Sequence, residues 1–310
     1  MTPLPKIIKN QTISSTALTI GTFDGVHIGH QKILQKLVAT AKQKGLIPTV
    51  LTLFPHPRMV LQGNASIKLL HTIDERIAFL QTCGIENVVV KTFTKTFANL
   101  TPEAYVKTIL VDELQTKHII IGYDHRFGKN RSANIEDLKS FAEDYGFTVQ
   151  EISAQDIEDV VVSSTKIRDA LNKGDVALAN TFLDYCYFIT GIVISGKQLG
   201  RKLGFPTANI MIKEDYKLIP KDGVYVVKSI IDDQQVYGMM NIGTNPTVEG
   251  HKHSIEVHFF NFEKNVYSKT LKVAFLKRIR DELKFDSIEA LKNQLIQDKL
   301  DSLRYIDSLQ

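Results

Sequence analysis

Two histidines and three glycines close together near the N-terminus form the first group that can do chemistry. Gly21, Gly25 and Gly29 leave room for a ligand to approach the backbone, where a strand pattern passes into a helix pattern. His27 and His30 are three residues apart, so in a first helical turn both imidazoles lie on one face. Beside a helix N-terminus they can donate hydrogen bonds to phosphate oxygens and stabilise a transferring phosphoryl group. The alternative is a structural pair or a partial metal site.

A second group that suits phosphate lies much further along the chain. Ser164 and Thr165 supply hydroxyl and amide groups at the start of a predicted helix. Arg168 lies one turn later, where its guanidinium can clamp a phosphate. A run of Ser and Thr is also a common N-cap, so this group alone does not define a site.

The C-terminal part contains a Gly-x-x-x-x-Gly-Lys run, Gly191–Lys197, that we exclude as a phosphate-binding P-loop. Gln198 stands where a P-loop has the Ser or Thr that binds Mg²⁺, and Ile-Val-Ile between the glycines is typical of a strand interior. The loop that follows is rich in glycine and basic residues, and it leads into Thr207 and Asn209. In an extended segment these two side chains point to the same side, and their oxygen atoms suit Mg²⁺.

The segment Ser254–Phe260 alternates strictly between apolar and polar residues, which predicts a strand. Glu256 and His258 share one face of that strand. Judged from the pattern alone, this face is exposed to solvent.

The elements that must position these residues fall into two groups. Up to about residue 180, strands alternate with helices, which predicts a parallel sheet covered on both faces. Ligands bind such sheets at the carboxyl ends of the strands. The predicted strands are 17–21, 48–54, 87–92, 118–121 and 148–152, and the predicted helices are 29–44, 73–83, 102–114, 135–145 and 175–182.

From about residue 187, short strands separated by turns predict an antiparallel barrel or sandwich with one terminal helix. The strands are 188–195, 208–212, 223–230, 236–241, 254–260 and 270–276, and the helix is 287–309. We therefore expect two domains, 1–184 and 185–310.

Composition excludes several other classes. A chain of 310 residues with 43% hydrophobic and 23% charged residues is typical of a globular protein. No apolar run approaches the ~18 residues of a membrane helix, and two cysteines build no disulfide framework, so we expect a cytoplasmic protein without a membrane partner. The first 184 residues contain 20 basic and 19 acidic residues, and the rest 18 and 15. This mild charge argues against nucleic-acid binding.

Taken in order, the motifs resemble those of bacterial bifunctional riboflavin kinase/FMN adenylyltransferases (FAD synthetases) over residues 14–305. Gly21–Gln31, Gly122–Gly128 and Ser163–Arg168 resemble the adenylyltransferase module, whereas Gly200–Asn209 and Asn241–Thr247 resemble the kinase. The resemblance implies an α/β doubly wound nucleotidylyltransferase domain, followed by a mostly antiparallel β-barrel domain with a C-terminal helix.

The resemblance also implies roles for individual residues. In the adenylyltransferase, His27 and His30 are catalytic, and ATP or phosphate is bound by Gly21, Phe23, Asp24, Gly29, Ser164, Thr165 and Arg168. The flavin side of that site is formed by Phe54, His56, Pro57, Asp124 and Phe127. In the kinase, Glu256 is the catalytic base, Gly196, Lys202 and Gly204 bind phosphate, Thr207 and Asn209 hold Mg²⁺, and Arg280 lies near flavin. For Arg280 a surface salt bridge is an equal alternative.

The implied reactions are phosphorylation of riboflavin to FMN by ATP, with release of ADP, and adenylylation of FMN to FAD, with release of pyrophosphate. Mg²⁺ is the implied cofactor of both. One rival hypothesis is a nucleotidyltransferase whose second domain only binds flavin. Another is a flavin-binding regulatory or RNA-associated protein.

Overall fold

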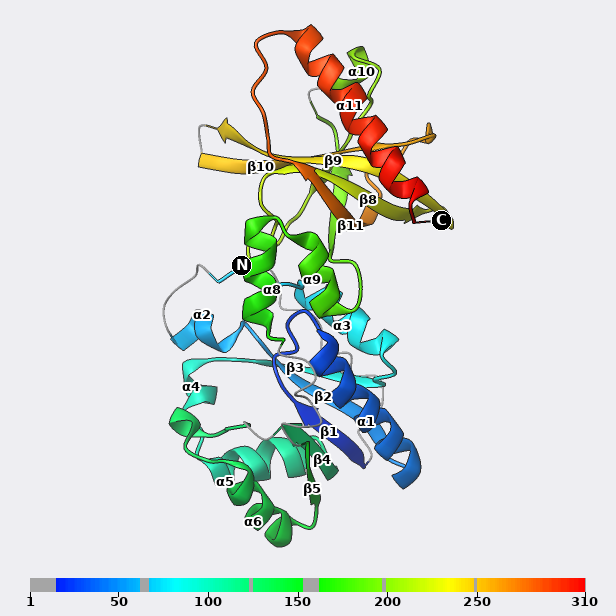
Figure 1. Ribbon diagram of the computed structural model, residues 1–310. Coiled ribbons are helices and arrows are strands. Elements are labelled where there is room, and N and C mark those ends of the chain that lie inside the picture. Colours follow the sequence, from blue (N-terminus) through cyan, green and yellow to red (C-terminus); the bar gives the residue numbers. More distant parts are fainter. Residues whose placement is uncertain are drawn as a thin grey trace. The chain divides into compact units, whose positions relative to one another are not determined.

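The computed structural model describes residues 15–61, 67–122, 125–152, 162–196, 199–247 and 250–309 (Figure 1). Contacts divide the chain into two compact units, Met1–Ser164 and Thr165–Gln310.

The first unit contains a five-stranded sheet with the strand order β3-β2-β1-β4-β5, in which every neighbouring pair is parallel. Parallel neighbours require crossover connections, and helices supply them. The predicted α/β sheet is confirmed, with small differences at the strand ends. Its strands are β1 (Thr16–Ile20), β2 (Ile47–Phe54), β3 (Asn87–Thr92), β4 (Thr116–Gly122) and β5 (Thr148–Ile152).

Alternate side chains of these strands build a separate core on each face of the sheet. Leu18 and Leu51 pack in one core, with η1 (Val106–Glu113) and α6 (Ile135–Tyr145). Their neighbours Ala17 and Val50 pack in the other, with α1 (Ile28–Lys44) and α3 (Ile73–Thr82). Burial of both faces explains why these strands have nearly continuous apolar sequences.

The strand order reverses at β1, which has β2 and β3 on one side and β4 and β5 on the other. In doubly wound sheets this reversal is where ligands bind, outside the carboxyl ends of the strands. The loops that follow β1 and β4 are therefore at the position where the topology favours a ligand.

Helix ends follow local capping. A capping box begins α3, in which the amide of Glu75 donates to the Thr72 hydroxyl and the amide of Thr72 donates to the Glu75 carboxylate. α1 ends at Gly45, whose φ of 64° favours glycine. The predicted helix 102–114 is divided into α5 (Pro102–Tyr105) and η1, which is a π-helix. The short helices α2 (Pro57–Leu61), α4 (Lys95–Ala98) and η2 (Lys129–Arg131) are too short to show a period in the sequence.

The second unit contains a closed barrel with the strand order β10-β7-β6-β11-β8-β9, in which all neighbours are antiparallel. Because the sheet closes on itself, the second unit is the predicted barrel and not the alternative sandwich. β9, β10 and β11 extend beyond their predicted ends. The strands are β6 (Phe188–Ile194), β7 (Ala208–Met211), β8 (Gly223–Ile231), β9 (Gln234–Thr247), β10 (Gly250–Phe259) and β11 (Thr270–Arg280).

Two helices, α8 (Ser164–Lys173) and α9 (Val176–Leu183), precede the barrel, and α9 is hydrogen-bonded to it. Asn180 Nδ2 donates to the Phe275 carbonyl at 3.0 Å, and the Tyr187 amide donates to Asn180 Oδ1 at 2.7 Å. The amide of Lys221, just before β8, donates to the Leu171 carbonyl of α8 at 3.0 Å. These contacts fit the grouping of both helices, from Thr165 onward, with the second unit, whereas both were predicted in the first domain. The domain limits 1–184 and 185–310 stay a prediction.

The C-terminal helix α11 (Ile288–Asp307) lies against the barrel (Figure 1). A buried ion pair and apolar packing attach it there. Arg280, at the end of β11, donates to the two carboxylate oxygens of Asp298 from Nε at 2.8 Å and from Nη2 at 2.6 Å. Gln294 Nε2 donates to the same carboxylate at 2.9 Å. The apolar cluster beneath the helix consists of Leu203, Phe205, Val226, Met239, Phe260, Leu276 and Ile306. Within the described ranges, no helix is long and apolar enough to cross a membrane.

The Arg280–Asp298 pair allows a stability test with a matched control. Asp298→Ala leaves a largely buried guanidinium without its counter-charge, so we expect the free energy of unfolding to fall by about 3–5 kcal/mol. Asp301→Ala, on the same helix, breaks a pair with Arg304, whose side chain is 77% exposed, and we expect a loss of at most about 1 kcal/mol. Urea unfolding followed by circular dichroism measures both, since the chain has no Trp. Equal losses would contradict this account.

Candidate active sites

The loop between β1 and α1 has a backbone conformation that few sequences adopt. Phe23 and Val26 have positive φ values of 46° and 37° although neither is glycine, and both side chains are buried. A Cβ at Gly25, where φ is 82°, would lie 2.4 Å from Cδ1 of Leu70. Such strain persists only where the surrounding packing holds it, and it is concentrated at functional sites.

This loop presents the two predicted catalytic histidines as a stacked pair. The ring centroids of His27 and His30 are 3.7 Å apart, and the ring planes differ by 16°. His27 is the N-cap of α1, and the first turn of that helix contains no acidic residue. The N-terminal amides of α1 and its positive dipole end therefore favour an anion. Gly21 directly follows β1, and Gly29 is buried in the first turn of α1.

The surroundings of His30 keep its imidazole neutral. Burial, the neighbouring His27 and the Arg76 cation hold the pKa of His30 well below its ordinary value of 6.5. Its Nδ1 atom is buried and has no hydrogen-bond partner among the residues that the structure describes. A neutral imidazole retains one N–H donor, which can meet a phosphate oxygen.

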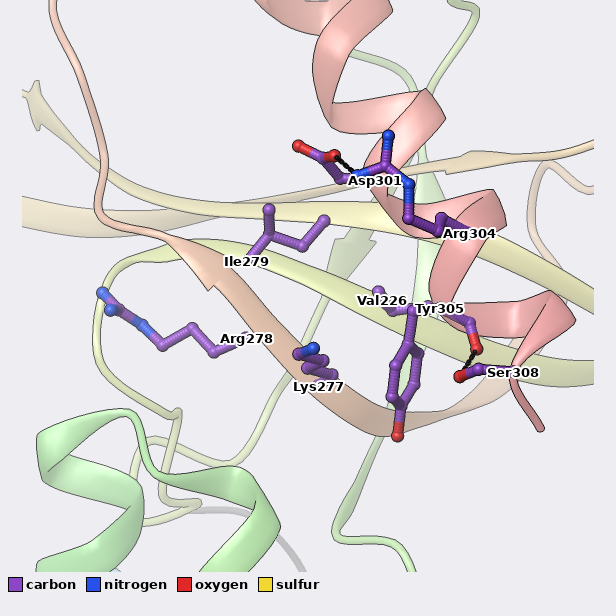
Figure 2. Close-up of a pocket in the computed structure, with 8 residues that line it drawn as sticks. All are labelled: Val226, Lys277, Arg278, Ile279, Asp301, Arg304, Tyr305 and Ser308. Carbon is purple, nitrogen blue, oxygen red and sulfur yellow. Dashed lines mark hydrogen bonds and ion pairs between the residues drawn. The ribbon is translucent and has the colours of Figure 1, made fainter.

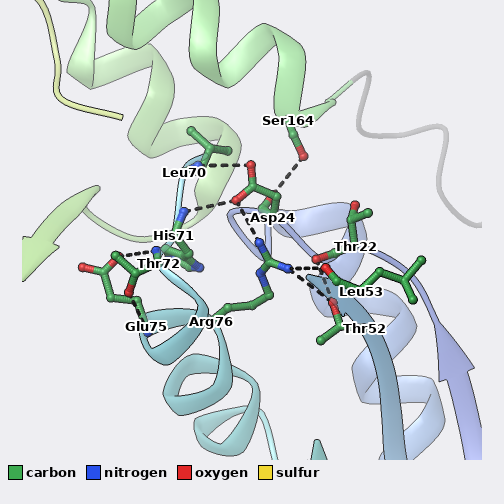
Figure 3. A network of polar contacts seen from close by, with 10 residues as sticks. All are labelled: Thr22, Asp24, Thr52, Leu53, Leu70, His71, Thr72, Glu75, Arg76 and Ser164. Atoms are coloured by element: carbon green, nitrogen blue, oxygen red, sulfur yellow. Dashed lines mark hydrogen bonds and ion pairs between the residues drawn. The ribbon is translucent and has the colours of Figure 1, made fainter. Parts of the chain in front are cut away.

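A buried ion pair, which the sequence analysis did not predict, lies behind this loop (Figure 3). The Asp24 carboxylate accepts hydrogen bonds from the amides of Leu70 and His71, each at 3.1 Å. Its Oδ1 lies 3.7 Å from Nη2 of Arg76, and neither residue is exposed. These contacts are internal to the fold, and phosphate binding by Asp24 stays a prediction.

The position of Arg76 in its helix is a signal in the sequence that this side chain is buried. In α3 it lies three residues after Ile73 and four before Leu80, so it occupies the apolar face of that helix. An arginine at such a position needs a buried counter-charge. The sequence offers many carboxylates, and only the fold selects Asp24.

The third motif reaches the same network through one residue. The Ser164 hydroxyl donates to the backbone carbonyl of Asp24 at 2.9 Å. Thr165 is exposed and Arg168 is partly buried, and both lie on α8 in the second unit. Phosphate binding by these three residues stays a prediction.

The predicted flavin-side residues of this site lie in two regions. Phe54 and His56 are partly buried at and just beyond the end of β2, and Pro57 begins α2. Phe127, beyond β4, is 6% exposed and packs in a core of the sheet. Asp124 lies outside the described residues. Contact of any of these residues with flavin stays a prediction.

In the barrel, the pairing of β7 with β10 brings three predicted kinase residues together. Glu256 is directly opposite Asn209, and the Thr207 hydroxyl donates to Glu256 Oε2 at 3.0 Å. Ser254, which the sequence analysis did not select, donates to Glu256 Oε1 at 3.1 Å. Its spacing of two from Glu256 along a strand was the available signal. Each carboxylate oxygen is thus oriented by one hydroxyl.

The glycine-rich loop closely approaches these residues. A Cβ at Gly196 would lie 2.2 Å from Nδ2 and 2.7 Å from Oδ1 of Asn209, so this backbone needs glycine to leave the amide in place. Gly204 has a positive φ of 86°, and a Cβ there would meet no neighbouring atom. Glycine is therefore favoured at this position by the backbone conformation and not by lack of space. Nothing of the Lys202 side chain is described. The phosphate roles of all three stay predictions.

His258 corrects the expectation that this face of β10 is exposed. It is 9% exposed, and its ring packs edge-to-face against Phe205 and Phe260 with centroids 5.3 and 5.7 Å away. Its Nδ1 donates to the Pro206 carbonyl at 2.9 Å, and burial lowers the pKa of this imidazole. The segment before β7 covers the strand, which the alternation in β10 did not reveal.

A pocket of about 440 Å³ lies between β8, β11 and the last turns of α11 (Figure 2). It contains none of the predicted site residues. Three of its charged side chains are paired: Arg304 and Asp301 with each other, and Arg278 with Asp281. The pocket is lined by Val226, Lys277, Arg278, Ile279, Asp301, Arg304, Tyr305 and Ser308.

Arg280, which is predicted to lie near flavin, forms an ion pair with Asp298. Its contact with flavin stays a prediction.

A parallel sheet with paired histidines at its topological reversal, followed by a closed antiparallel barrel, defines a nucleotidyltransferase-type α/β domain joined to a barrel domain. Residues 9–166 match the family model described as FAD synthetase, and residues 183–306 match the model described as riboflavin kinase. The chain belongs to the family of bifunctional riboflavin kinase/FMN adenylyltransferases.

Curated relatives with that name agree over nearly the whole chain. One from Buchnera aphidicola is 40% identical and covers 92% of both chains, and one from Bacillus subtilis is 37% identical over 98% of this chain and 96% of its own. A solved structure described as a macrolide-efflux protein from Streptococcus pneumoniae has a TM-score of 0.83 with 31% identity over 94% of both chains.

The lowered pKa of His30 predicts a pH-dependent stability. Between the native pKa and 6.5 the unfolded chain binds a proton that the folded chain does not, so the free energy of unfolding rises with pH and levels off above 6.5. We expect His30→Gln to remove part of this slope. Urea unfolding between pH 5 and 8 measures it. Because burial also lowers the pKa of His118 and His258, only the difference between wild type and variant belongs to His30. An unchanged slope would contradict the assignment.

The close approach at Gly196 predicts a selective defect. Gly196→Ala must displace the Asn209 amide, so we expect FMN formation from riboflavin to fall by at least about 10-fold. FAD formation from supplied FMN should not change. Ser195→Ala, at the exposed neighbouring residue, is the control. Chromatographic separation of the flavins measures both steps, and a fully active Gly196→Ala enzyme would show that the approach is unimportant.

Proposed function

We propose that this chain makes FMN from riboflavin and ATP in its barrel unit, and FAD from FMN and ATP in its α/β unit. The observation that carries the proposal is the presence of both family modules, each with its motifs, in one chain. ADP and pyrophosphate are the by-products.

Adenylyl transfer needs no covalent intermediate and no general base. The FMN phosphate is already anionic, so one of its oxygens attacks the α-phosphorus of ATP, and the bond from that phosphorus to the pyrophosphate oxygen breaks. Catalysis is then positioning, which contributes up to ~7–11 kcal/mol, together with stabilisation of the developing charge. The stacked pair of His27 and His30 at the start of α1 supports a role as hydrogen-bond donors to the phosphates.

Phosphorylation of riboflavin does need a base. We assign this role to Glu256, which takes the proton of the 5′-hydroxyl as that oxygen attacks the γ-phosphorus and ADP leaves. Such a base typically contributes ~10²–10⁴-fold. The hydroxyls of Thr207 and Ser254 orient the carboxylate from either side, which supports the assignment.

The residues around Glu256 fit a magnesium ion. Thr207 and Asn209 carry neutral oxygen atoms, and because Thr207 donates its proton to Glu256, the lone pairs of its oxygen remain available to a cation. The Gly196 backbone lies so close to the Asn209 amide that a Cβ would not fit between them. A magnesium ion bound there would neutralise charge on the phosphates of ATP, and we propose Mg²⁺ at this site.

A cytoplasmic location of the protein is likewise a proposal.

Reciprocal variants test the two assignments in one protein. With riboflavin, ATP and Mg²⁺, we expect the wild-type chain to accumulate FMN and then FAD, separated by chromatography. Glu256→Gln should lower FMN formation by ~10²–10⁴-fold and leave FAD formation from supplied FMN unchanged. His30→Ala should have the opposite effect.

Each reaction is the folding control for the other, because both are measured on the same preparation. If Glu256→Gln left the kinase step intact, Glu256 would not be the base. If the wild-type chain formed neither flavin, the proposed function would be wrong.

A further inference from the structure

We propose that Arg76 is a positioning residue for adenylyl transfer. By pairing with Asp24 it holds the loop between β1 and α1 in the conformation that presents His27 and His30 to the phosphates. The inference rests on the proposed function of the α/β unit.

Asp24 connects the loop to a segment distant in sequence. Its carboxylate accepts the amides of Leu70 and His71, which immediately precede α3. At this same place Gly25 packs against the Leu70 side chain so closely that a Cβ would not fit. The loop is thus attached to the 70–71 segment by hydrogen bonds and packing together (Figure 3).

Arg76 connects this attachment to the sheet. Its Nη1 donates to the Thr52 hydroxyl at 3.3 Å and to the Leu53 carbonyl at 3.5 Å, at the carboxyl end of β2. Thr52 in turn donates to the carbonyl of Thr22, in the loop itself, at 3.1 Å. The Arg76 guanidinium therefore links α3 to β2. It also contacts the strained loop at two places, at Asp24 directly and at Thr22 through the Thr52 hydroxyl.

The loop that Asp24 and Arg76 hold has a strained backbone. Phe23 and Val26 flank Asp24 at positive φ, a conformation that persists only under constraint. The hydrogen bonds made by Asp24 and by Arg76 supply a constraint that apolar packing of similar volume does not, because hydrogen bonds depend on orientation. His27 follows Val26 directly, so relaxation of the loop moves the N-cap of α1 and the histidine pair.

Two further observations fit this role. The Ser164 hydroxyl donates to the backbone carbonyl of Asp24, which gives the loop a further polar contact within the first unit. After burial and His27, the Arg76 cation also helps to hold the pKa of His30 below its ordinary value, which fits a position close to the histidine pair.

Three variants separate positioning from stability. Arg76→Met removes the ion pair. Arg76→Lys keeps the charge but not the guanidinium, whose two terminal nitrogens contact β2 and Asp24 separately. Asp24→Asn combined with Arg76→Met removes both charges, which avoids an unpaired buried ion. For FAD formation from supplied FMN we expect kcat to fall about 100-fold in Arg76→Met and in the double variant, with KM for FMN changed less than threefold. Arg76→Lys should recover about 10-fold of that loss.

Phosphorylation of riboflavin by the same preparations should stay within twofold of wild type, and melting temperature reports folding. Lys139→Gln, which breaks an exposed ion pair with Glu136 in the same unit, should change neither activity. If the folded double variant and Arg76→Lys both keep the wild-type kcat for FAD formation, the inference is overturned, even if Arg76→Met unfolds. A wild-type chain that makes no FAD would instead overturn the proposed function.

Discussion

The carboxylate of Asp24 is buried at the carboxyl edge of the parallel sheet, where it accepts two backbone amides and pairs with Arg76. The loop on one side of it leads to His27 and His30 at the start of α1, and the segment on its other side leads into α3. Removal of either charge would leave the other buried and uncompensated, which typically costs several kcal/mol. We infer that the geometry of the first site depends on this pair, although the pair lies behind the proposed catalytic histidines.

The barrel unit uses the same kind of interaction for another purpose. Arg280 and Asp298 form a bidentate pair that fixes α11 on the barrel. Glu256 differs from both buried aspartates, because the contacts described for it are with the hydroxyls of Thr207 and Ser254. A guanidinium neutralises a carboxylate, whereas hydroxyl groups orient it and leave its charge available. This contrast separates the two structural carboxylates from the proposed base.

Much of this arrangement was predictable from sequence periodicity. Strands with apolar residues on both faces indicated a covered parallel sheet, and the spacing of His27 and His30 indicated one helical face, which the structure confirms. Arg76, Ser254 and the burial of His258 were not predicted. The partner of Arg76 and the segment that buries His258 lie far away in the sequence, and local pattern gives no means of choosing them. Ser254 lies only two residues from Glu256, so its spacing was a signal that the sequence did contain.

The sequence by itself determined the order of the elements, the two modules and the residue types available for chemistry, because periodicity, turn residues and motifs are local properties. Only the tertiary structure decided the choice of Asp24 as the partner of Arg76, the closure of the barrel and the pairing of Glu256 with Asn209. These depend on how strands and helices pack. The reason is physical: a buried charge or an open strand edge is costly, and only the folded chain shows which distant group satisfies it.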